Sequence, residues 1–407
     1  MAGKNNNRGL VLMGAAVTGG ITGAIYMWSV FNKPLMAQYG WGAVEVSMAY
    51  SLYLLMVCIG GFFAGALQRR FPPKYLVLTG GVMMGIGYLL TGFVDSIVML
   101  YVTFSLIGGL GNSFIYNTAV STTVKWFPDK RGFANGICIG SMGLAPLVFA
   151  PLANVLIERF DAASAFQILG VGLIVAYCVF SWFLKVPEPG WKPEGWTPEG
   201  GGQVDSGKVG YSMVEMLKTP LFWLMWLIFA CAATGGMMMT GQASGIGQSL
   251  ANMTTAQGAL MVGVLAVGNF LGRFAFGSLS DKIGRFQTLI ICTVITSIAM
   301  VCFPAATTFS TFLAMIIIVG ACFGGIMCIM PSLTGDAFGA ANIGQNYAAV
   351  YSGYTCASFI GPTVASSCVA STGDYSLAFI VAAVLSVAAL LLMIVAWKVY
   401  ASMAKKA

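Results

Sequence analysis

The sequence of 407 residues contains no histidine, and only 8% of its residues are charged. The absence of histidine removes the side chain that most often acts as a general base and as a metal ligand. A soluble globular domain carries roughly 25% charged residues, which this chain does not approach. Most residues must therefore face lipid or one another, and we predict a membrane protein.

Cysteine pairs with metal-binding or redox spacing are also missing. The ten cysteines all fall inside apolar runs, where small thiols pack as hydrophobic side chains. The 52 glycines, which are abundant, suit the close approach of helices in a bilayer. We expect no metal and no cofactor.

Long apolar runs fill most of the chain, and a spanning helix needs about 20 mainly apolar residues. A polar stretch, 186–219, contains the run PEPGWKPEGWTPEGG, which cannot continue a helix. We predict an all-α membrane protein with two six-helix bundles, 1–185 and 220–407, joined by this stretch as a cytoplasmic linker. The twelve predicted transmembrane helices are 10–31, 44–67, 75–94, 97–124, 132–153, 163–185, 220–247, 255–280, 287–306, 310–334, 343–370 and 376–400.

The basic residues gather in alternate loops. If both termini are cytoplasmic, Lys33 and Arg159 fall outside, Arg273 falls within a helix, and the other Lys and Arg residues are cytoplasmic. Basic residues on the cytoplasmic side set the orientation, so we predict a multi-pass protein of the cell (inner) membrane with cytoplasmic N- and C-termini. The net charge of +7 forms no basic stripe with interleaved aromatics, and a nucleic-acid partner is not expected.

A charged loop signature follows the eighth predicted helix. It matches G-x-x-x-D-[RK]-x-G-[RK] of the major facilitator superfamily through Gly277, Asp281, Lys282, Gly284 and Arg285. The corresponding loop after the second helix, 65–74, has Arg69 in place of the acid. One copy in each half resembles the parallel repeat of that fold. The resemblance implies a transporter in which these residues form a conformational signature.

Four shorter stretches resemble the oxalate/formate-antiporter family. They are 24–31, 125–132, 216–223 and 346–347. Bacterial members of that family move oxalate, formate, lactate or pyruvate, and they are similar to animal monocarboxylate transporters. The resemblance covers nearly the whole chain and implies a carrier similar to bacterial monocarboxylate (L-lactate) transporters.

Arg273 is the one basic residue placed deep inside a predicted helix, whereas Lys185 and Lys398 stand at the cytoplasmic ends of theirs. Burying an arginine at mid-helix costs roughly 2.5–3.5 kcal/mol on insertion scales. None of the 13 acids is expected at mid-membrane, so the chain itself supplies no obvious partner. Because a guanidinium binds a carboxylate through two hydrogen bonds, we predict that the substrate is the missing anion. The alternative is a snorkelling or cytoplasm-facing arginine that is bonded to helix carbonyls.

The number of cations bears on the identity of the substrate. Oxalate-transporting members of the family carry an arginine at the place of Arg273 and a lysine in helix eleven, where this chain has Tyr354. Two cations suit a dicarboxylate, and one suits a monocarboxylate. This difference favours lactate, pyruvate, formate or acetate over oxalate, with L-lactate chosen first from the family resemblance.

Polar side chains on other predicted helices can complete a site between the two bundles. Asn269 lies one turn before the buried arginine, on the same face, and Asn112 and Tyr116 lie one turn apart on the fourth helix. For each of them, interhelical hydrogen bonding or interfacial placement is the alternative. The predicted substrate-binding residues are Arg273, Asn269, Asn112, Tyr116, Tyr26 and Tyr354.

Coupling and function class complete the prediction. Animal monocarboxylate transporters carry a proton-accepting aspartate where this chain has Asn269, so we favour a proton that travels on the substrate in symport, with oxalate/formate-type antiport as the alternative.

No set of nucleophiles, acids or metal ligands converges in the membrane, so we do not predict an enzyme. A channel and a carboxylate sensor without transport are the competing classes, but a repeat with a midplane charge favours alternating access. We expect a monocarboxylate, protons and the lipid bilayer as partners, and a monomeric functional unit.

Overall fold

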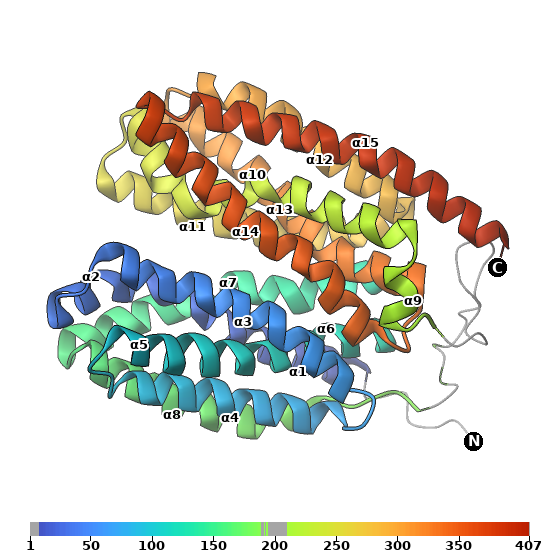
Figure 1. Ribbon diagram of the computed structural model, residues 1–407, viewed down its shortest axis with the longest axis horizontal. Helices are drawn as coiled ribbons and strands as arrows, with labels where there is room; N and C mark the ends of the chain where they lie inside the picture. The colour runs from blue at the N-terminus through green and yellow to red at the C-terminus, as the bar shows by residue number, and fades with distance from the viewer. Residues whose placement is uncertain (1–7, 189–190, 192, 194–209, 407) are drawn as a thin grey trace. The chain divides into compact units, whose positions relative to one another are not determined.

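The computed structural model describes residues 8–188, 191, 193 and 210–406, and most of the predicted linker 186–219 lies outside these residues. Within the described residues the chain is almost entirely helical and contains no strand (Figure 1). It divides into two compact units. The first is built from Met1–Pro128, Ser141–Lys192 and Asn342–Ala348, and the second from Asp129–Gly140, Pro193–Ala341 and Ala349–Ala407.

Each predicted transmembrane helix corresponds to a helical stretch. Two of the long helices contribute residues to both units, namely α7 Arg131–Arg159 and α14 Ile343–Thr372. The other helices of the first unit are α1 Arg8–Thr22, η2 Gly23–Met27, α2 Trp28–Tyr39, α3 Ala43–Leu67, α4 Pro73–Thr91, α5 Ile97–Leu100, the π-helical η3 Tyr101–Gly108, α6 Gly109–Trp126, α8 Ala162–Phe180 and η4 Ser181–Phe183. The other helices of the second unit are α9 Met213–Leu217, α10 Pro220–Ala251, α11 Thr255–Ile283, α12 Arg285–Cys302, η5 Phe303–Ala305, α13 Phe309–Phe338 and α15 Ser376–Lys406.

Eleven helical stretches in the described part of the chain are long and apolar enough to cross a membrane. The twelfth long helix, α14, has 30 residues and is not among them. It carries Asn, Gln, Tyr, Ser and Thr side chains along its length, and these lower its hydropathy. Several helices continue beyond their predicted ends. About 20 residues at 1.5 Å each span the hydrocarbon core, so the additional turns of a longer helix extend past the core.

Both ends of α11 are set by local chemistry. At the start, the Thr254 hydroxyl accepts a hydrogen bond from the Gln257 N–H, and the Gln257 side chain accepts one from the Thr254 N–H. This capping box satisfies two amides that the helix leaves unpaired. At the other end Gly284 adopts φ +104°, which favours glycine, and α12 begins at the next residue.

Glycines bring α11 against α13 in the second unit. A Cβ added at Gly268 would lie 2.9 Å from the Ile317 carbonyl oxygen, and one at Gly272 would collide with the Ala321 backbone. From the other side, a Cβ at Gly324 would collide with the Asn269 carbonyl. The missing side chains allow the two backbones to touch, as is usual for helices packed in a membrane. The contact fixes the segment of α11 that contains Arg273.

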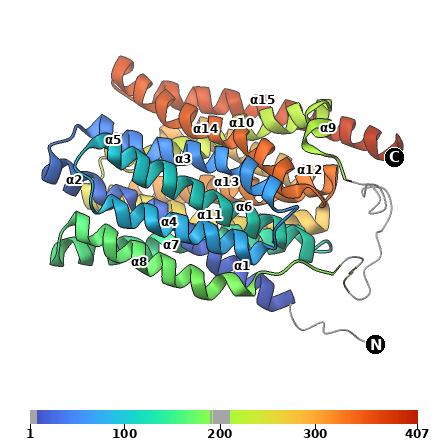
Figure 2. The same ribbon diagram turned by 60° about the horizontal axis from the view of Figure 1, so that its bottom comes forward.

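In the first unit α4 packs along α8, and Figure 2 shows the two helices side by side. A Cβ at Gly85 would lie 2.7 Å from the Gly170 carbonyl oxygen, so glycine again permits the close approach. Aromatic rings fill the interior nearby. Trp28 stacks on Phe104 with ring centroids 4.2 Å apart, and Phe31 stacks on Phe166 at 4.1 Å.

Candidate functional site

Arg273 is buried in the second unit. Its side chain lies on α11, and the residue is only 3% exposed. It stands ten residues before the end of the helix, which corresponds to about 15 Å along the axis, or half of a typical hydrocarbon core. The mid-membrane depth of Arg273 stays a prediction.

The guanidinium of Arg273 has one polar partner in the described part of the chain. Its Nη1 donates a hydrogen bond to the carbonyl oxygen of Ile139 on α7, and its buried Nε has no partner. The ion pairs that the structure describes join other residues, and none of them involves Arg273. The hydrogen bond to a helix carbonyl is one part of the alternative stated from the sequence. The charge itself remains without a carboxylate among these residues.

The helix backbones around Arg273 are closely packed. A Cβ at Gly136 of α7 would lie 2.5 Å from the Arg273 carbonyl oxygen, and the Cys328 thiol of α13 donates to the same oxygen at 3.1 Å. Asn269, one turn earlier on α11, is 7% exposed. Neighbouring helices therefore hold the position of the buried charge.

Tyr354 lies on α14 in the second unit and is 6% exposed. Its ring is surrounded by other aromatic rings, with centroids 5.0 Å from Tyr351, 5.6 Å from Phe229 and 6.4 Å from Phe323. Rings at these separations attract one another and form an apolar surface. Tyr354, which the family resemblance places where a lysine is expected, thus belongs to an aromatic cluster.

The side-chain amide of Asn112 is used inside the first unit. Its Nδ2 donates to the Thr22 carbonyl at 2.9 Å and to the Tyr53 hydroxyl at 3.0 Å. These bonds tie α6 to α1 and α3, which corresponds to the structural alternative stated for this residue. The amide oxygen of Asn112 is not used in these two bonds.

Tyr116 and Tyr26 also belong to the first unit. The hydroxyl groups of Tyr116 and Tyr347 lie 3.2 Å apart, and both side chains are buried. Tyr26 is half-buried in the short helix η2. The predicted residues thus fall into two groups, of which the first unit holds Asn112, Tyr116 and Tyr26, and the second holds Arg273, Asn269 and Tyr354.

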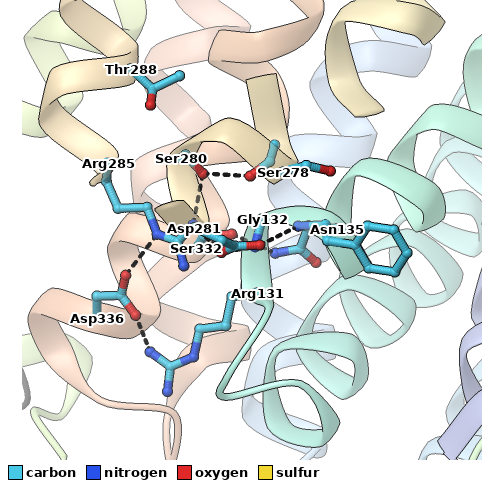
Figure 3. Close-up of polar contacts among 12 residues, drawn as sticks. Arg131, Gly132, Asn135, Ser278, Ser280, Asp281, Arg285, Thr288, Ser332 and Asp336 are labelled. Carbon is cyan, nitrogen blue, oxygen red and sulfur yellow. Dashed lines mark hydrogen bonds and ion pairs between the residues drawn. The ribbon is translucent and has the colours of Figure 1, made fainter. Parts of the chain in front are cut away.

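A charged network surrounds the loop signature at the end of α11 (Figure 3). The Asp336 carboxylate on α13 accepts from Arg131 Nη1 at the start of α7 and, at 2.9 Å, from Arg285 Nε. Arg285 also pairs with Asp281 through Nη1. Two carboxylates and two guanidinium groups therefore alternate in this network.

Asp281 binds the start of α7 directly. Its Oδ1 accepts from the Gly132 N–H at 2.9 Å, and its Oδ2 accepts from the Phe133 N–H at 2.8 Å (Figure 3). The first amides of a helix lack partners within it and carry partial positive charge, so a carboxylate is favoured there. Gly277 is required beside this contact, because a Cβ there would lie 2.5 Å from the Gly132 carbonyl oxygen. The acid and the first glycine of the signature thus act on α7.

Two members of the network, Arg131 and Asp336, were not predicted as functional residues. They are 205 positions apart, and no local pattern connects them. The available signal was the position of Arg131 directly after Asp129-Lys130, at the start of a predicted helix.

Lys282 of the signature is exposed, and Gly284 provides the break between α11 and α12. Among the residues described, no group of three or more acidic or sulfur side chains could hold a metal ion.

Comparison with known proteins shows which proteins this chain resembles. Residues 11–285 and 225–406 match the model of the Major Facilitator Superfamily. The uncharacterized MFS-type transporter YhjX of Escherichia coli K12 is 31% identical over 352 residues, covering 85% of this chain and 85% of that protein. The oxalate:formate antiporter of Oxalobacter formigenes is 29% identical over 371 residues, covering 90% of this chain and 85% of that protein. Monocarboxylate transporter 12 of Xenopus laevis is 23% identical over 336 residues, covering 77% and 72%.

A solved structure shares the fold. The crystal structure of a bacterial homologue of the iron transporter ferroportin, in an outward-facing state, aligns with a TM-score of 0.74 at 16% identity, covering 97% of this chain and 100% of that one. Identity at this level supports the fold alone. The predicted fold class, an all-α membrane protein with two helical bundles, is confirmed.

Proposed function

Because this chain belongs to the Major Facilitator Superfamily, we propose that it is a secondary active transporter of small monocarboxylates, with L-lactate as the first candidate. Its relatives by sequence include an oxalate:formate antiporter and a monocarboxylate transporter, and this supports a carboxylate anion as the cargo. The protein acts in this proposal as a carrier and not as an enzyme.

The observation that carries the proposal is the buried guanidinium of Arg273. A charge that is 3% exposed and has an unpartnered Nε is costly in an apolar interior. A substrate carboxylate lowers that cost, because it supplies both a negative charge and acceptors for the remaining N–H groups. Asn269 stands one turn away on the same helix and can orient the substrate.

A monocarboxylate fits the charge around this site better than a dicarboxylate. Tyr354 occupies the position of the second cation and is packed among aromatic rings. Such a wall suits the short apolar body of lactate or pyruvate and leaves a second carboxylate without a partner. Asn112, Tyr116 and Tyr26 are proposed to contribute further polar contacts.

Proton symport by alternating access is the proposed mechanism. When no anion is bound, the uncompensated charge of Arg273 opposes the change between outward-facing and inward-facing states. A bound carboxylate neutralises the arginine, and a proton carried with the substrate keeps the overall step electrically neutral. The protein is proposed to lie in the cell (inner) membrane as a monomeric functional unit, with both termini cytoplasmic.

Exchange of oxalate for formate is the second candidate. It rests on the 29% identity to the oxalate:formate antiporter over 90% of this chain. In this mechanism a counter-anion in the opposite compartment is required, and a proton gradient has no effect.

Uptake into reconstituted vesicles tests the proposal. Radiolabelled L-lactate, pyruvate, formate, acetate and oxalate are offered separately, with and without a protonophore. The proposal predicts accumulation of a monocarboxylate that the protonophore abolishes. Preference for oxalate with strict dependence on an internal anion would support the antiporter instead, and saturable binding without accumulation would identify a sensor.

A further inference from the structure

A basic pocket lies in the first unit, between the end of α3, the start of α4 and the segment that follows η4. The cavity has a volume of about 500 Å³, and its lining includes Arg69, Arg70, Lys74 and Lys185. The ion pairs among the described residues involve none of these four cations. Positive charges gathered in one cavity repel one another, so the basic pocket favours an anion.

The loop 65–74, which supplies three of these cations, corresponds to the signature loop of the second unit, and the comparison shows why it is free to hold an anion. There, Asp281 binds the first amides of α7. At the corresponding place in the first unit stands Arg69, whose positive charge cannot accept hydrogen bonds from a helix start. Gly65 nevertheless packs like Gly277, since a Cβ there would lie 2.5 Å from the Gln345 N at the start of α14. The packing role is retained, and the charge of the loop is reversed.

The basic pocket lies where three candidate membrane spans end, namely Met48–Leu67, Pro73–Thr91 and Ala162–Phe183. We expect phospholipid headgroups at this level. Exposed aromatic side chains, which are typical of the interface, stand around the pocket, with Phe71 49%, Tyr75 47% and Trp182 56% exposed. The Lys74 ammonium lies 4.7 Å from the Tyr75 ring centroid and 4.8 Å from that of Trp182.

An exposed apolar stripe runs along the helix that ends beside the pocket. On α8 the exposed side chains recur every three or four residues and so share one helix face. The stripe ends at Trp182, close to Lys74 and therefore to the pocket. We call this face the α8 stripe, and its residues are Ile168, Val171, Val175 and Val179 of α8 and Trp182 of the adjoining η4.

We propose that the basic pocket binds the phosphate of an anionic phospholipid, with an acyl chain along the α8 stripe. Arg69 and Arg70 offer guanidinium forks, which match phosphate oxygens in pairs. Lys74 and Lys185 add charge that a zwitterionic lipid cannot neutralise. The shared chemistry is that of any phosphate, and the adjoining apolar stripe favours a lipid over a soluble ion.

Native mass spectrometry of the purified full-length protein tests this assignment. Phosphatidylglycerol and phosphatidylcholine are added at equal concentration, and the bound lipid is counted. The triple variant Arg69→Gln/Arg70→Gln/Lys74→Gln is compared with the wild type. The control, Arg159→Gln/Lys218→Gln/Lys398→Gln, removes the same charge outside the pocket. We expect the wild type and the control to bind phosphatidylglycerol in preference to phosphatidylcholine. In the pocket variant, we expect the amount of bound phosphatidylglycerol to fall at least tenfold.

Two further arms distinguish the source of the phosphate. Inorganic phosphate and glycerol 3-phosphate should not displace the lipid. A phosphatidylglycerol with brominated chains should quench tryptophan fluorescence in the wild type more than in Trp182→Phe. Equal retention by the pocket variant, equal loss in the control, equal quenching in Trp182→Phe, or displacement by soluble phosphate would each overturn the proposal.

Discussion

At the scale of single residues, Arg273 and Tyr354 together determine how much negative charge the proposed site accepts. Arg273 supplies one guanidinium group, which binds a carboxylate through two hydrogen bonds. Tyr354 is neutral and packs against Phe229 and Tyr351. We therefore propose that the site balances the charge of one carboxylate.

Tyr354→Lys should move the preference toward a dicarboxylate. The new ammonium adds a second cation to the proposed site, where the family resemblance places a lysine in oxalate-transporting members. We expect the ratio of oxalate to L-lactate uptake to rise by about tenfold, as expected when a charged hydrogen bond is gained. Competition between the two labelled anions in vesicles measures this ratio. Tyr354→Phe is the matched control, and an unchanged ratio in the lysine variant would contradict the charge argument.

At the scale of helices, glycines fix the position of the buried charge. Gly272 precedes Arg273 on α11 and touches the Ala321 backbone. Gly263, two and a half turns earlier on the same helix, has open space around it. The two positions therefore separate the effect of packing from the effect of helix propensity.

Gly272→Ala should lower both thermal stability and substrate uptake, because the new methyl group collides with backbone that cannot rotate away. Gly263→Ala should be neutral or stabilising by about 0.5–1 kcal/mol, the usual gain for this change inside a helix. Thermal unfolding in detergent and vesicle uptake measure the two effects. If both variants behave alike, contact between α11 and α13 does not position the site.

The network at the start of α7 provides a second test at this scale. Asp336 lies between Arg131 and Arg285, so Asp336→Asn leaves two guanidinium groups with less negative charge. Removing one partner of a buried pair costs ~3–5 kcal/mol, and the 22% exposure of the Asp336 side chain reduces this to about 1–3 kcal/mol. We expect the unfolding temperature to fall by several degrees. The exposed Asp95→Asn serves as the control, and an equal shift in both variants would contradict this role for the network.

At the scale of the whole molecule, the direction of the driving force distinguishes symport from exchange. If the proton travels with the carboxylate, an acidic exterior should raise L-lactate uptake severalfold, and a protonophore should remove the increase. The interior pH should fall as substrate enters. A pH-sensitive dye trapped in the vesicles records that fall. Uptake that ignores the pH gradient but requires an internal anion would contradict symport.

Most of the fold was predictable, because membrane helices are specified by runs of about 20 apolar residues that need no knowledge of tertiary contacts. The absence of an ion-pair partner for Arg273 among the described residues was also predictable, since the acids of the sequence fall in loops and near helix ends. The bonds of Asn112 to Thr22 and Tyr53 were not, because they join different helices. Arg131 and Asp336 escaped prediction for the same reason, as only the folded chain brings them together.

Counterflow of labelled L-lactate tests the central claim most directly, because it needs no pH gradient and reports binding and movement of the substrate alone. Vesicles loaded with unlabelled L-lactate are compared for the wild type, Arg273→Gln and the exposed control Arg159→Gln. The account predicts saturable counterflow in the wild type and the control, and a loss of at least about 100-fold at low substrate in Arg273→Gln, because more than one charged hydrogen bond disappears. Full counterflow in Arg273→Gln, with the same half-saturating concentration as the wild type, would contradict the account.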